Sequence, residues 1–236
     1  MRKRKYSSLQ HGSAHKRARL DAAGVPVPRC HNIVSTSQIQ TSLRSIDLER
    51  LASLFPFTSY DRKRFAAITI RLANPHCTCL LFGSGKLVIT GSTSYHACLV
   101  ASQSITGMLR EVNPRESFEV VSCVVQNIVA HVELAQGEHI NLDALYSRFC
   151  ECSTYQRSIF PGLVLRPPES PIVLLIFNSG RIVCTGGKSY DDIYYGFAEM
   201  FNVLRVYVVR PRVGGAAISS SAQPPAVEAA PEVEAE

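Results

Sequence analysis

The sequence predicts an α+β fold that consists of two copies of one unit of about 90 residues. Four motifs recur in the second half of the chain, each 95 residues after its first occurrence. They are Asn32-Ile33-Val34 with Asn127-Ile128-Val129, Phe65 with Phe160, Phe82-Gly83-Ser84-Gly85-Lys86 with Phe177-Asn178-Ser179-Gly180-Arg181, and Thr90-Gly91 with Thr185-Gly186. Chance does not preserve one register across four separate motifs, so the second half of the chain duplicates the first.

Each copy shows the same order of strand and helix patterns. An alternating strand opens the copy, and a short helix follows at Asp47–Phe55 or at Asn141–Phe149. Leu48 matches Leu142 at an offset of 94 and not 95, so the second copy has one more residue than the first between this leucine and its phenylalanine, Phe160. The last two strands of each copy meet at a Ser-Gly turn, which predicts a hairpin. The three strands after the short helix are Phe65–Leu72, Cys77–Phe82 and Lys86–Thr90 in the first copy, and Phe160–Arg166, Ile172–Phe177 and Arg181–Thr185 in the second.

A longer helix closes each copy. In the second copy, Ser189 and Asp192 have the spacing of a capping box at a helix start. Cys98 in the first copy matches Ile193 in the second, so we expect a small buried thiol there. The apolar faces are Cys98, Ala101, Ile105, Met108 and Leu109 in one helix, and Ile193, Phe197, Met200, Phe201 and Leu204 in the other.

The strands of the predicted sheet have two unlike faces, because side chains alternate along a strand. In the strand Phe65–Leu72, one face is uniformly apolar, and in Arg181–Thr185 one face carries Ile182 and Cys184. Asn127 and Val129 share a face, with Ile128 and Ala130 opposite. The apolar face of Phe65–Leu72 carries Ala66, Ile68, Ile70 and Leu72, and the mixed face carries Phe65, Ala67, Thr69 and Arg71. We expect the apolar face to lie under the helices and the mixed face to bind something, since an exposed aliphatic surface reduces solubility.

The mixed face has the chemistry of a minor-groove binder. The minor groove offers only acceptors at A·T pairs and a protruding amino group at G·C pairs. Asn and Thr can donate to those acceptors, while Val and Leu fill the space that a guanine amino group would need. Arg and Lys at the rim can reach phosphates, and exposed Phe side chains can wedge between base steps.

Residues 28–209 closely resemble the core domain of the TATA-box-binding protein family. Specific matching stretches are Asn32-Ile33-Val34-Ser35-Thr36, Lys63-Arg64-Phe65-Ala66-Ala67, Phe160-Pro161-Gly162-Leu163 and Ile172-Val173-Leu174-Leu175-Ile176-Phe177. The resemblance implies a curved antiparallel saddle with four helices on its convex face and double-stranded DNA bound under its concave face. It further implies kinking of TATA-like promoter DNA and nucleation of the transcription pre-initiation complex.

The resemblance also implies a set of DNA-contacting residues in duplicate. The kinking phenylalanine pairs fall on Phe65 with Phe82 and on Phe160 with Phe177, and the central asparagines on Asn32 and Asn127. The groove-contacting threonines fall on Thr90 and Thr185, and the aliphatic contacts on Val34, Val129, Leu80, Leu175, Val88 and Val183. The phosphate contacts fall on Arg64, Arg71, Ser84, Lys86, Arg166, Ser179, Arg181 and Lys188, although Ser84 and Ser179 can also serve their turns.

Charge is unevenly distributed along the chain, whose formal net charge is +6. Residues 1–20 contain seven Lys or Arg and no acid, and residues 214–236 contain four Glu and no base. Arg2-Lys3-Arg4-Lys5 and Lys16-Arg17-Ala18-Arg19 resemble the two halves of a nuclear-import signal, which predicts a nuclear protein; a solvated tail without a receptor is the alternative. We therefore divide the chain into a disordered basic tail at 1–23, repeat 1 at 24–116, repeat 2 at 117–213 and a disordered acidic tail at 214–236.

Several other classes of protein are disfavoured. No stretch approaches the roughly 20 uninterrupted apolar residues of a membrane span, so we expect no membrane partner. The eight cysteines include two C-x-C pairs but no C-x-x-C, so we expect reduced thiols in an intracellular protein, with no metal site. The seven histidines are scattered, and none recurs beside a carboxylate in the repeat, so we expect no catalytic residues, no enzyme activity and no cofactor. His131, expected on the groove face near Asn127, is interpreted as a structural histidine with its hydrogen bonds satisfied and not as a catalytic base.

Differences from the family concentrate on its partner-binding surfaces. Thr93 stands where the family usually has Lys, although the matching Lys188 is kept. The second stirrup of the saddle, Tyr155–Phe160, lacks the acidic residues that engage the B-type initiation factor, and Tyr95–Arg110 offers only His96 and Arg110 as basic residues. General transcription factors and the RNA polymerase machinery are the implied partners, with B-type contact in doubt. The alternative is a related protein that acts mainly as a protein-interaction module with altered partners.

Overall fold

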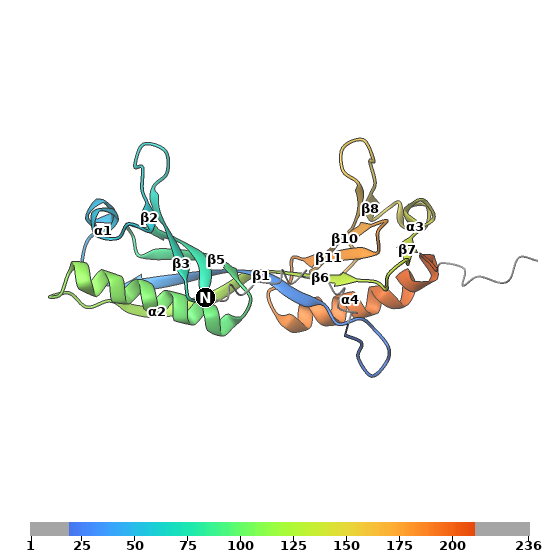
Figure 1. Cartoon of the computed structure of the whole chain (residues 1–236), viewed down its shortest axis with the longest axis horizontal. Coiled ribbons are helices and arrows are strands. Elements are labelled where there is room, and N and C mark those ends of the chain that lie inside the picture. The colour runs from blue at the N-terminus through green and yellow to red at the C-terminus, as the bar shows by residue number, and fades with distance from the viewer. Residues whose placement is uncertain (1–18, 211–236) are drawn as a thin grey trace, which may run out of the picture.

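The computed structural model describes residues 19–210, which form a saddle with one large sheet and four α-helices (Figure 1). Most of the two predicted tails, residues 1–18 and 211–236, lies outside the described residues. In Figure 1 the loops above β2 and β8 project on the side of the sheet opposite to α2 and α4. We call these loops the first stirrup (Tyr60–Phe65) and the second stirrup (Tyr155–Phe160).

Apart from the additional two-residue strand β7 (His139–Ile140), the helices and strands follow the same order in both halves, as predicted from the repeat. The first half contains β1 (Arg29–Gln40), α1 (Leu48–Leu54), β2 (Thr58–Ser59), β3 (Ala67–Ala73), β4 (His76–Phe82), β5 (Lys86–Ser92) and α2 (Tyr95–Val112). The second half contains β6 (Glu119–Glu133), β7 (His139–Ile140), α3 (Leu142–Phe149), β8 (Ser153–Thr154), β9 (Gly162–Leu165), β10 (Val173–Phe177), β11 (Arg181–Thr185) and α4 (Tyr190–Leu204). A 3₁₀ turn, η1 (Arg205–Tyr207), and β12 (Val208–Val209) follow α4.

The large sheet is antiparallel and its strand order is symmetric about its centre. Ten strands pair in the order β2-β3-β4-β5-β1-β6-β11-β10-β9-β8, and β12 pairs with β7 in a separate two-stranded sheet. The two long strands β1 and β6 lie side by side and join the halves, with Arg29 opposite His131 and Gln40 opposite Glu119. Because the two repeats share one sheet, their undersides form one continuous surface.

Two predicted strand starts are wrong. The sequence pattern placed Phe65 and Phe160 inside strands, but β3 begins at Ala67 and β9 at Gly162. The backbone N–H of Phe65 donates to the Asp61 carbonyl at 2.9 Å, and that of Phe160 to the Gln156 carbonyl at 2.9 Å, so each Phe ends a turn of its stirrup. At the other end of β9, Arg166 lies just beyond the strand.

The turn also shifts the alternation that we predicted for the first residues of β3. Ala66 is exposed and Ala67 is buried, the reverse of the prediction. From Ile68 onward the predicted faces hold, because Ile68 and Ile70 are buried while Thr69 is half-buried and Arg71 is exposed. The mixed face of this strand therefore begins at Thr69.

The helices begin and pack as their sequences predict. Asp47, Ser94, Asn141 and Ser189 are N-caps whose side chains accept a hydrogen bond from a backbone N–H of the first turn. The capping box of Ser189 and Asp192 is confirmed. Every residue of the two predicted helix faces is buried in the common core except Met200, which is half-buried. Cys98 is fully buried, as expected from its match with Ile193.

A turn precedes β1 and packs against α4. The Asp21 carboxylate accepts hydrogen bonds from the backbone N–H groups of Ala23 and Val25 at 2.8 Å each, and from the Tyr194 hydroxyl at 2.6 Å. These bonds hold the pKa of Asp21 below its usual value, chiefly through the Tyr194 hydroxyl. Residues 19–23, which we assigned to the basic tail, are therefore ordered against the fold.

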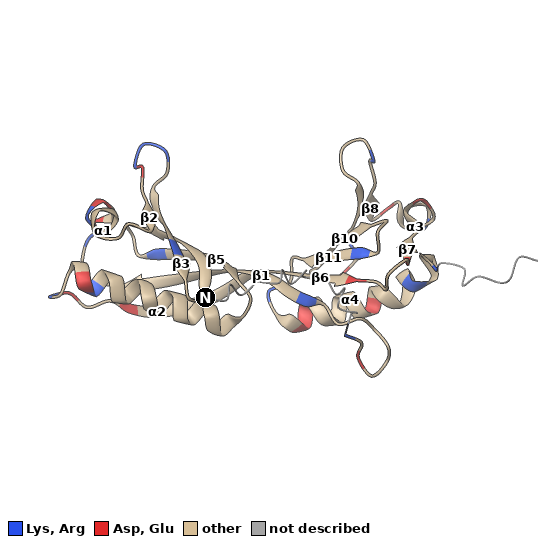
Figure 2. Ribbon diagram, in the orientation of Figure 1, with Lys and Arg blue, Asp and Glu red and all other residues tan. Residues whose placement is uncertain are grey.

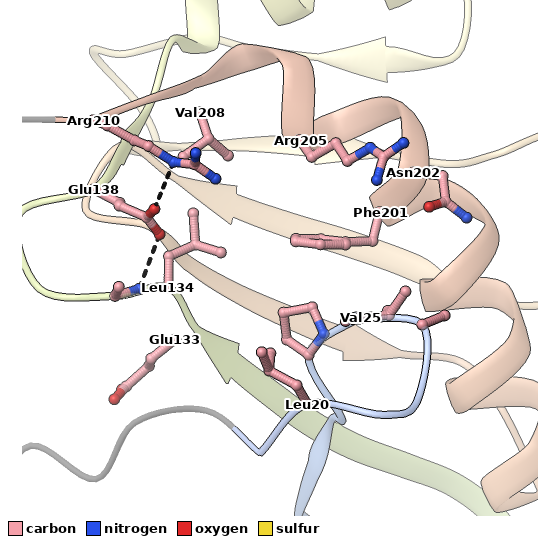
Figure 3. A pocket seen from close by; sticks show the side chains of 14 residues that line it. Leu20, Val25, Glu133, Leu134, Glu138, Phe201, Asn202, Arg205, Val208 and Arg210 are labelled. Atoms are coloured by element: carbon pink, nitrogen blue, oxygen red, sulfur yellow. Dashed lines mark hydrogen bonds and ion pairs between the residues drawn. The ribbon is translucent and has the colours of Figure 1, made fainter.

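A cavity of about 350 Å³ lies between this turn and the C-terminal end of α4 (Figure 3). Leu20, Leu134, Phe201 and Val208 give it apolar walls. At its rim the Arg210 Nε donates to the Glu138 Oε1 at 3.1 Å. The cavity contains none of the side chains that were predicted to contact DNA.

Within the described residues, no helix is long and apolar enough to cross a membrane. No His, Cys, Asp and Glu side chains of residues 19–210 cluster in a group of three or more that could bind a metal ion. Cys77, Cys79, Cys98 and Cys184 are buried free thiols, and Cys150 is exposed.

Candidate nucleic-acid interface

The underside of the saddle is the sheet face opposite to the helices. On β1, Ile33 and Ser35 are buried, so Asn32 and Val34 point to the underside. On β6, Ile128 and Ala130 are buried, so Asn127 and Val129 do the same. Since Asn32 lies opposite Val129 and Val34 opposite Asn127, the four side chains form a two-fold pattern at the centre.

The two central asparagines are held by the protein in one orientation. The Asn32 Oδ1 accepts from the Gly91 N–H at 2.6 Å, and the Asn127 Oδ1 accepts from the Gly186 N–H at 2.8 Å. Both glycines have left-handed backbone, with φ of 93° and 98°, which residues other than Gly rarely adopt. The left-handed backbone that each of these two hydrogen bonds requires explains why Gly follows Thr in both repeats. The Asn127 Nδ2 also lies within donating distance of the Thr185 Oγ1, at 3.1 Å. Since an amide nitrogen has two N–H donors, each asparagine keeps at least one donor for acceptors in a ligand.

Threonines and aliphatic side chains extend this pattern outward on both sides. Thr90 and Thr185 each lie within hydrogen-bond reach of their asparagine, at 3.4 Å and 3.2 Å from its Oδ1. Leu80 lies opposite Val88 across β4 and β5, and Leu175 lies opposite Val183 across β10 and β11. All four aliphatic side chains are half-buried, so each half presents the same low apolar ridge.

Each end of the underside carries a pair of phenylalanines. The ring centroids of Phe65 and Phe82 lie 5.9 Å apart, and those of Phe160 and Phe177 lie 5.6 Å apart, both in edge-to-face geometry. Phe65 is 48% exposed, although an apolar ring of this size is usually buried. A Cβ at Gly162 would lie 2.8 Å from Phe160 and 3.0 Å from Phe177, so this glycine makes room for the second pair.

The predicted phosphate-contacting cations are all exposed, and they surround the underside in both halves. Figure 2 shows Lys and Arg on the first stirrup and on strands of both halves. Arg181 has an acidic neighbour, with its guanidinium 4.0 Å from the Glu133 carboxylate. Ser84 and Ser179 lie in the hairpin turns and are exposed. The cations are Arg64, Arg71, Lys86, Arg166, Arg181 and Lys188.

Three side chains of the underside were not among the predicted DNA contacts. Arg29 and His131 lie opposite each other on β1 and β6, and the rings of His31 and His131 lie 5.7 Å apart. A shift of register between Cys30 and Asn32 brings His31 to this side, and that bulge has no sequence signal. The alternation of β6 does place His131 on the face of Val129. Burial and the nearby Arg181 lower the pKa of His131, which favours its neutral form.

The fold and the underside define a class: a two-repeat antiparallel saddle with helices on one face and a donor-rich, apolar, cation-rimmed surface on the other. The family model described as transcription factor TFIID, or TATA-binding protein, matches residues 27–112 and again residues 122–207. The chain belongs to the TATA-box-binding protein family. This confirms the predicted family, fold and duplication, and it agrees with the expectation that the chain is not an enzyme.

Relatives from distant organisms match over the same part of the chain. The TATA-box-binding protein of Caenorhabditis elegans is 34% identical over 77% of this chain and 51% of its own length. TATA-box-binding protein 2 of Arabidopsis thaliana is 35% identical over 77% of this chain and 87% of its own. The solved structure of Methanococcus jannaschii TBP has a TM-score of 0.63 at 29% identity, covering 77% of this chain and 99% of that one. The chain thus spans about half the length of its nematode relative.

Proposed function

We propose that the chain is a DNA-binding transcription factor that clamps the minor groove of A·T-rich promoter DNA and nucleates assembly of the pre-initiation complex. The observation that carries the proposal is the duplicated underside, in which two oriented amides lie between two phenylalanine pairs. Of these four rings, Phe65 is exposed and the other three are half-buried. Its relatives are named for the TATA box, which supports the same ligand. The nucleus is the proposed location, and the basic residues that suggest import lie almost wholly outside the described part of the chain.

Three physical contributions make up the proposed mechanism. Neutralisation of phosphates by the exposed cations supplies affinity that falls with salt. Insertion of the Phe pairs unstacks two base steps, which costs a few kcal/mol for each step and favours flexible TA steps. The opened groove then covers the aliphatic ridges and meets the Nδ2–H donors of Asn32 and Asn127 with its A·T acceptors. Catalysis has no part in this mechanism.

We expect a gel-shift titration to show salt-dependent binding with a preference for TATA-like duplexes. The six exposed cations predict that the logarithm of the association constant falls against that of salt with a slope of roughly −5. Each A·T pair replaced in the site weakens binding by about 1–3 kcal/mol. A scrambled duplex of the same length, at two salt concentrations, is the control. Equal affinity for the two duplexes would leave the alternative, a protein-interaction module, as the better account.

We also propose that the set of partners has diverged from that of conventional family members. In the second stirrup, Arg157 pairs with Asp143 of α3 and donates from Nε to the Tyr155 hydroxyl at 2.8 Å, and Ile159 is 79% exposed. This surface is basic and apolar where the family presents acidic residues. On α2 the exposed side chains include Tyr95, and the only Lys, Arg, Asp or Glu residues are Arg110 and Glu111 near its end.

A conventional B-type initiation factor should therefore bind this chain weakly on DNA, because its cognate carboxylates are missing. The measurement is a pull-down on a labelled TATA duplex, with TATA-box-binding protein 2 of Arabidopsis as the matched positive control. Charge-restoring variants Gln156→Glu and Ser158→Glu should raise the recovery. Normal recovery with the unchanged chain would refute the divergence of partners and leave the DNA-binding proposal intact.

A further inference from the structure

The two halves of the underside share most of their residue types. They differ on the outer strands, where Thr69 and Thr78 match Val164 and Val173, and at one place beside the centre. At an offset of 95 residues, Val34, Leu80, Val88 and Thr90 have the same residue type in both repeats. Three neighbouring positions differ in chemistry. We call Arg29, His31 and His131 the histidine patch, and their matches Val124, Gln126 and Thr36 the glutamine patch.

The two patches occupy matching places in the sheet. His131 lies opposite Arg29 on β1 and opposite Val183 on β11. Thr36 lies opposite Val124 on β6 and opposite Val88 on β5. Register shifts at His31 and at Gln126 bring each of these side chains toward its partner. The patches therefore flank the central asparagines on opposite sides, one in each half.

Their hydrogen bonding differs. The Gln126 Nε2 donates to the Thr36 Oγ1 at 2.8 Å, so the amide and hydroxyl groups of the glutamine patch can each still donate or accept. In the histidine patch the ring of His31 meets the ring of His131 edge-on, at an interplanar angle of 79°. The Nδ1 of His131 is buried without a hydrogen-bond partner among the described residues.

Two observations favour a neutral ring at His131. A second ring proton would have to sit on the buried Nδ1, where no acceptor of the described residues meets it. Burial lowers the pKa of His131, the charges of Arg181 and Arg29 and the neighbouring His31 lower it further, and Glu133 opposes them. Because a buried N–H without an acceptor is costly, we expect the neutral ring to carry its single proton on Nε2, where it can donate to a ligand.

We propose that His131, supported by His31, is a specificity-determining residue that restricts the second-repeat half of the site to A·T pairs. An N–H donor suits the N3 and O2 acceptors of A·T pairs, but it opposes the amino group of guanine. Gln126 can accept from that amino group, so the first half tolerates a G·C pair. Since A·T and T·A look alike in the minor groove, this difference fixes the direction in which a pseudo-symmetric saddle sits on its site. The inference rests on the proposed DNA binding.

The test uses a duplex with one G·C pair in one half of an otherwise A·T site, labelled so that energy transfer to a dye on the protein reports direction. We expect the unchanged chain to prefer, by at least about fivefold, the direction that places repeat 2 on the uninterrupted half. The double variant His31→Gln/His131→Thr replaces the two histidines of the patch by the residues of their matches and should lower this ratio toward one. Binding of the variant to the all-A·T duplex is measured alongside, so that the ratio reports direction separately from overall affinity.

Two further variants separate the possible outcomes. The reverse change, Thr36→His/Gln126→His, should make both halves reject G·C and weaken binding of the mixed duplex in either direction. His131→Gln restores an acceptor with little change in packing and should alone reduce the ratio. An unchanged ratio in both His131 variants would overturn the inference. Failure of the unchanged chain to bind the all-A·T duplex would instead refute the proposed function itself.

Discussion

The double variant Phe160→Ala/Phe177→Ala should lose most of its ability to bend DNA while its salt dependence stays nearly unchanged. The pair lies at one end of the underside, beside Gly162, and we expect it to be the aromatic wedge of its half. Without the rings, the base step stays stacked and the groove stays narrow. Removal of each ring from the bases costs about 1–3 kcal/mol of stacking energy. The measurement is energy transfer between dyes at the two ends of a TATA duplex.

Cation variants provide the matched control for this result. Arg166→Ala/Arg181→Ala removes two charges from the same half, so the salt slope should become less steep by about 0.9 for each phosphate that is no longer neutralised. The bend at saturating protein should persist, because the phenylalanine pair remains. A normal bend in the phenylalanine variant, measured at full occupancy, would show that these rings are not the wedge.

Phe197→Ala should lower the free energy of unfolding by about 3–5 kcal/mol. Phe197 lies on α4, is fully buried, and packs against Phe201 with ring centroids 5.4 Å apart. Truncation leaves a cavity between α4 and the sheet that the neighbouring side chains fill only in part. Urea unfolding followed by circular dichroism measures the change.

Phe65→Ala is the matched control, because the same substitution then removes an exposed ring. Phe65 is 48% exposed, so its removal should change stability by less than about 1 kcal/mol. The two variants should also separate by function. Phe197→Ala should still bend DNA when folded, whereas Phe65→Ala should impair bending at its end of the site. Comparable decreases of stability in the two variants would contradict the assignment of Phe197 to the core and of Phe65 to the DNA-binding surface.

The duplication explains why so much of the fold could be predicted from the sequence. Helix caps such as Ser189 and apolar faces such as that of Phe197 are local signals, and the fixed offset between the repeats shows the apolar face in both copies. The same offset of 95 residues identified the two asparagines and the two phenylalanine pairs as repeated positions. Phe65 and Phe160 lie ahead of their strands because each donates a backbone hydrogen bond within its stirrup, to Asp61 or to Gln156. No pattern of residues in the sequence predicts these two turns.

The features that were missed depend on contacts between distant segments. The turn at Asp21 is ordered by the Tyr194 hydroxyl, a residue 173 positions away, so its composition alone suggested a tail. His31 belongs to the underside because of a bulge in the pairing of β1 with β6. Bulges insert a residue without a periodic signature, and side-chain faces beyond one are misassigned by simple alternation.

The pairing of β1 with β6 also has a consequence for folding of the chain during its synthesis. During synthesis β1 emerges some 90 residues ahead of β6, so for that interval its inner edge has no partner, and unpaired edges invite aggregation. Contacts so far apart in sequence form slowly, which prolongs the exposure. The second repeat thus covers the inner edge of β1, which gives a reason, besides the proposed DNA binding, for both repeats to lie on one polypeptide.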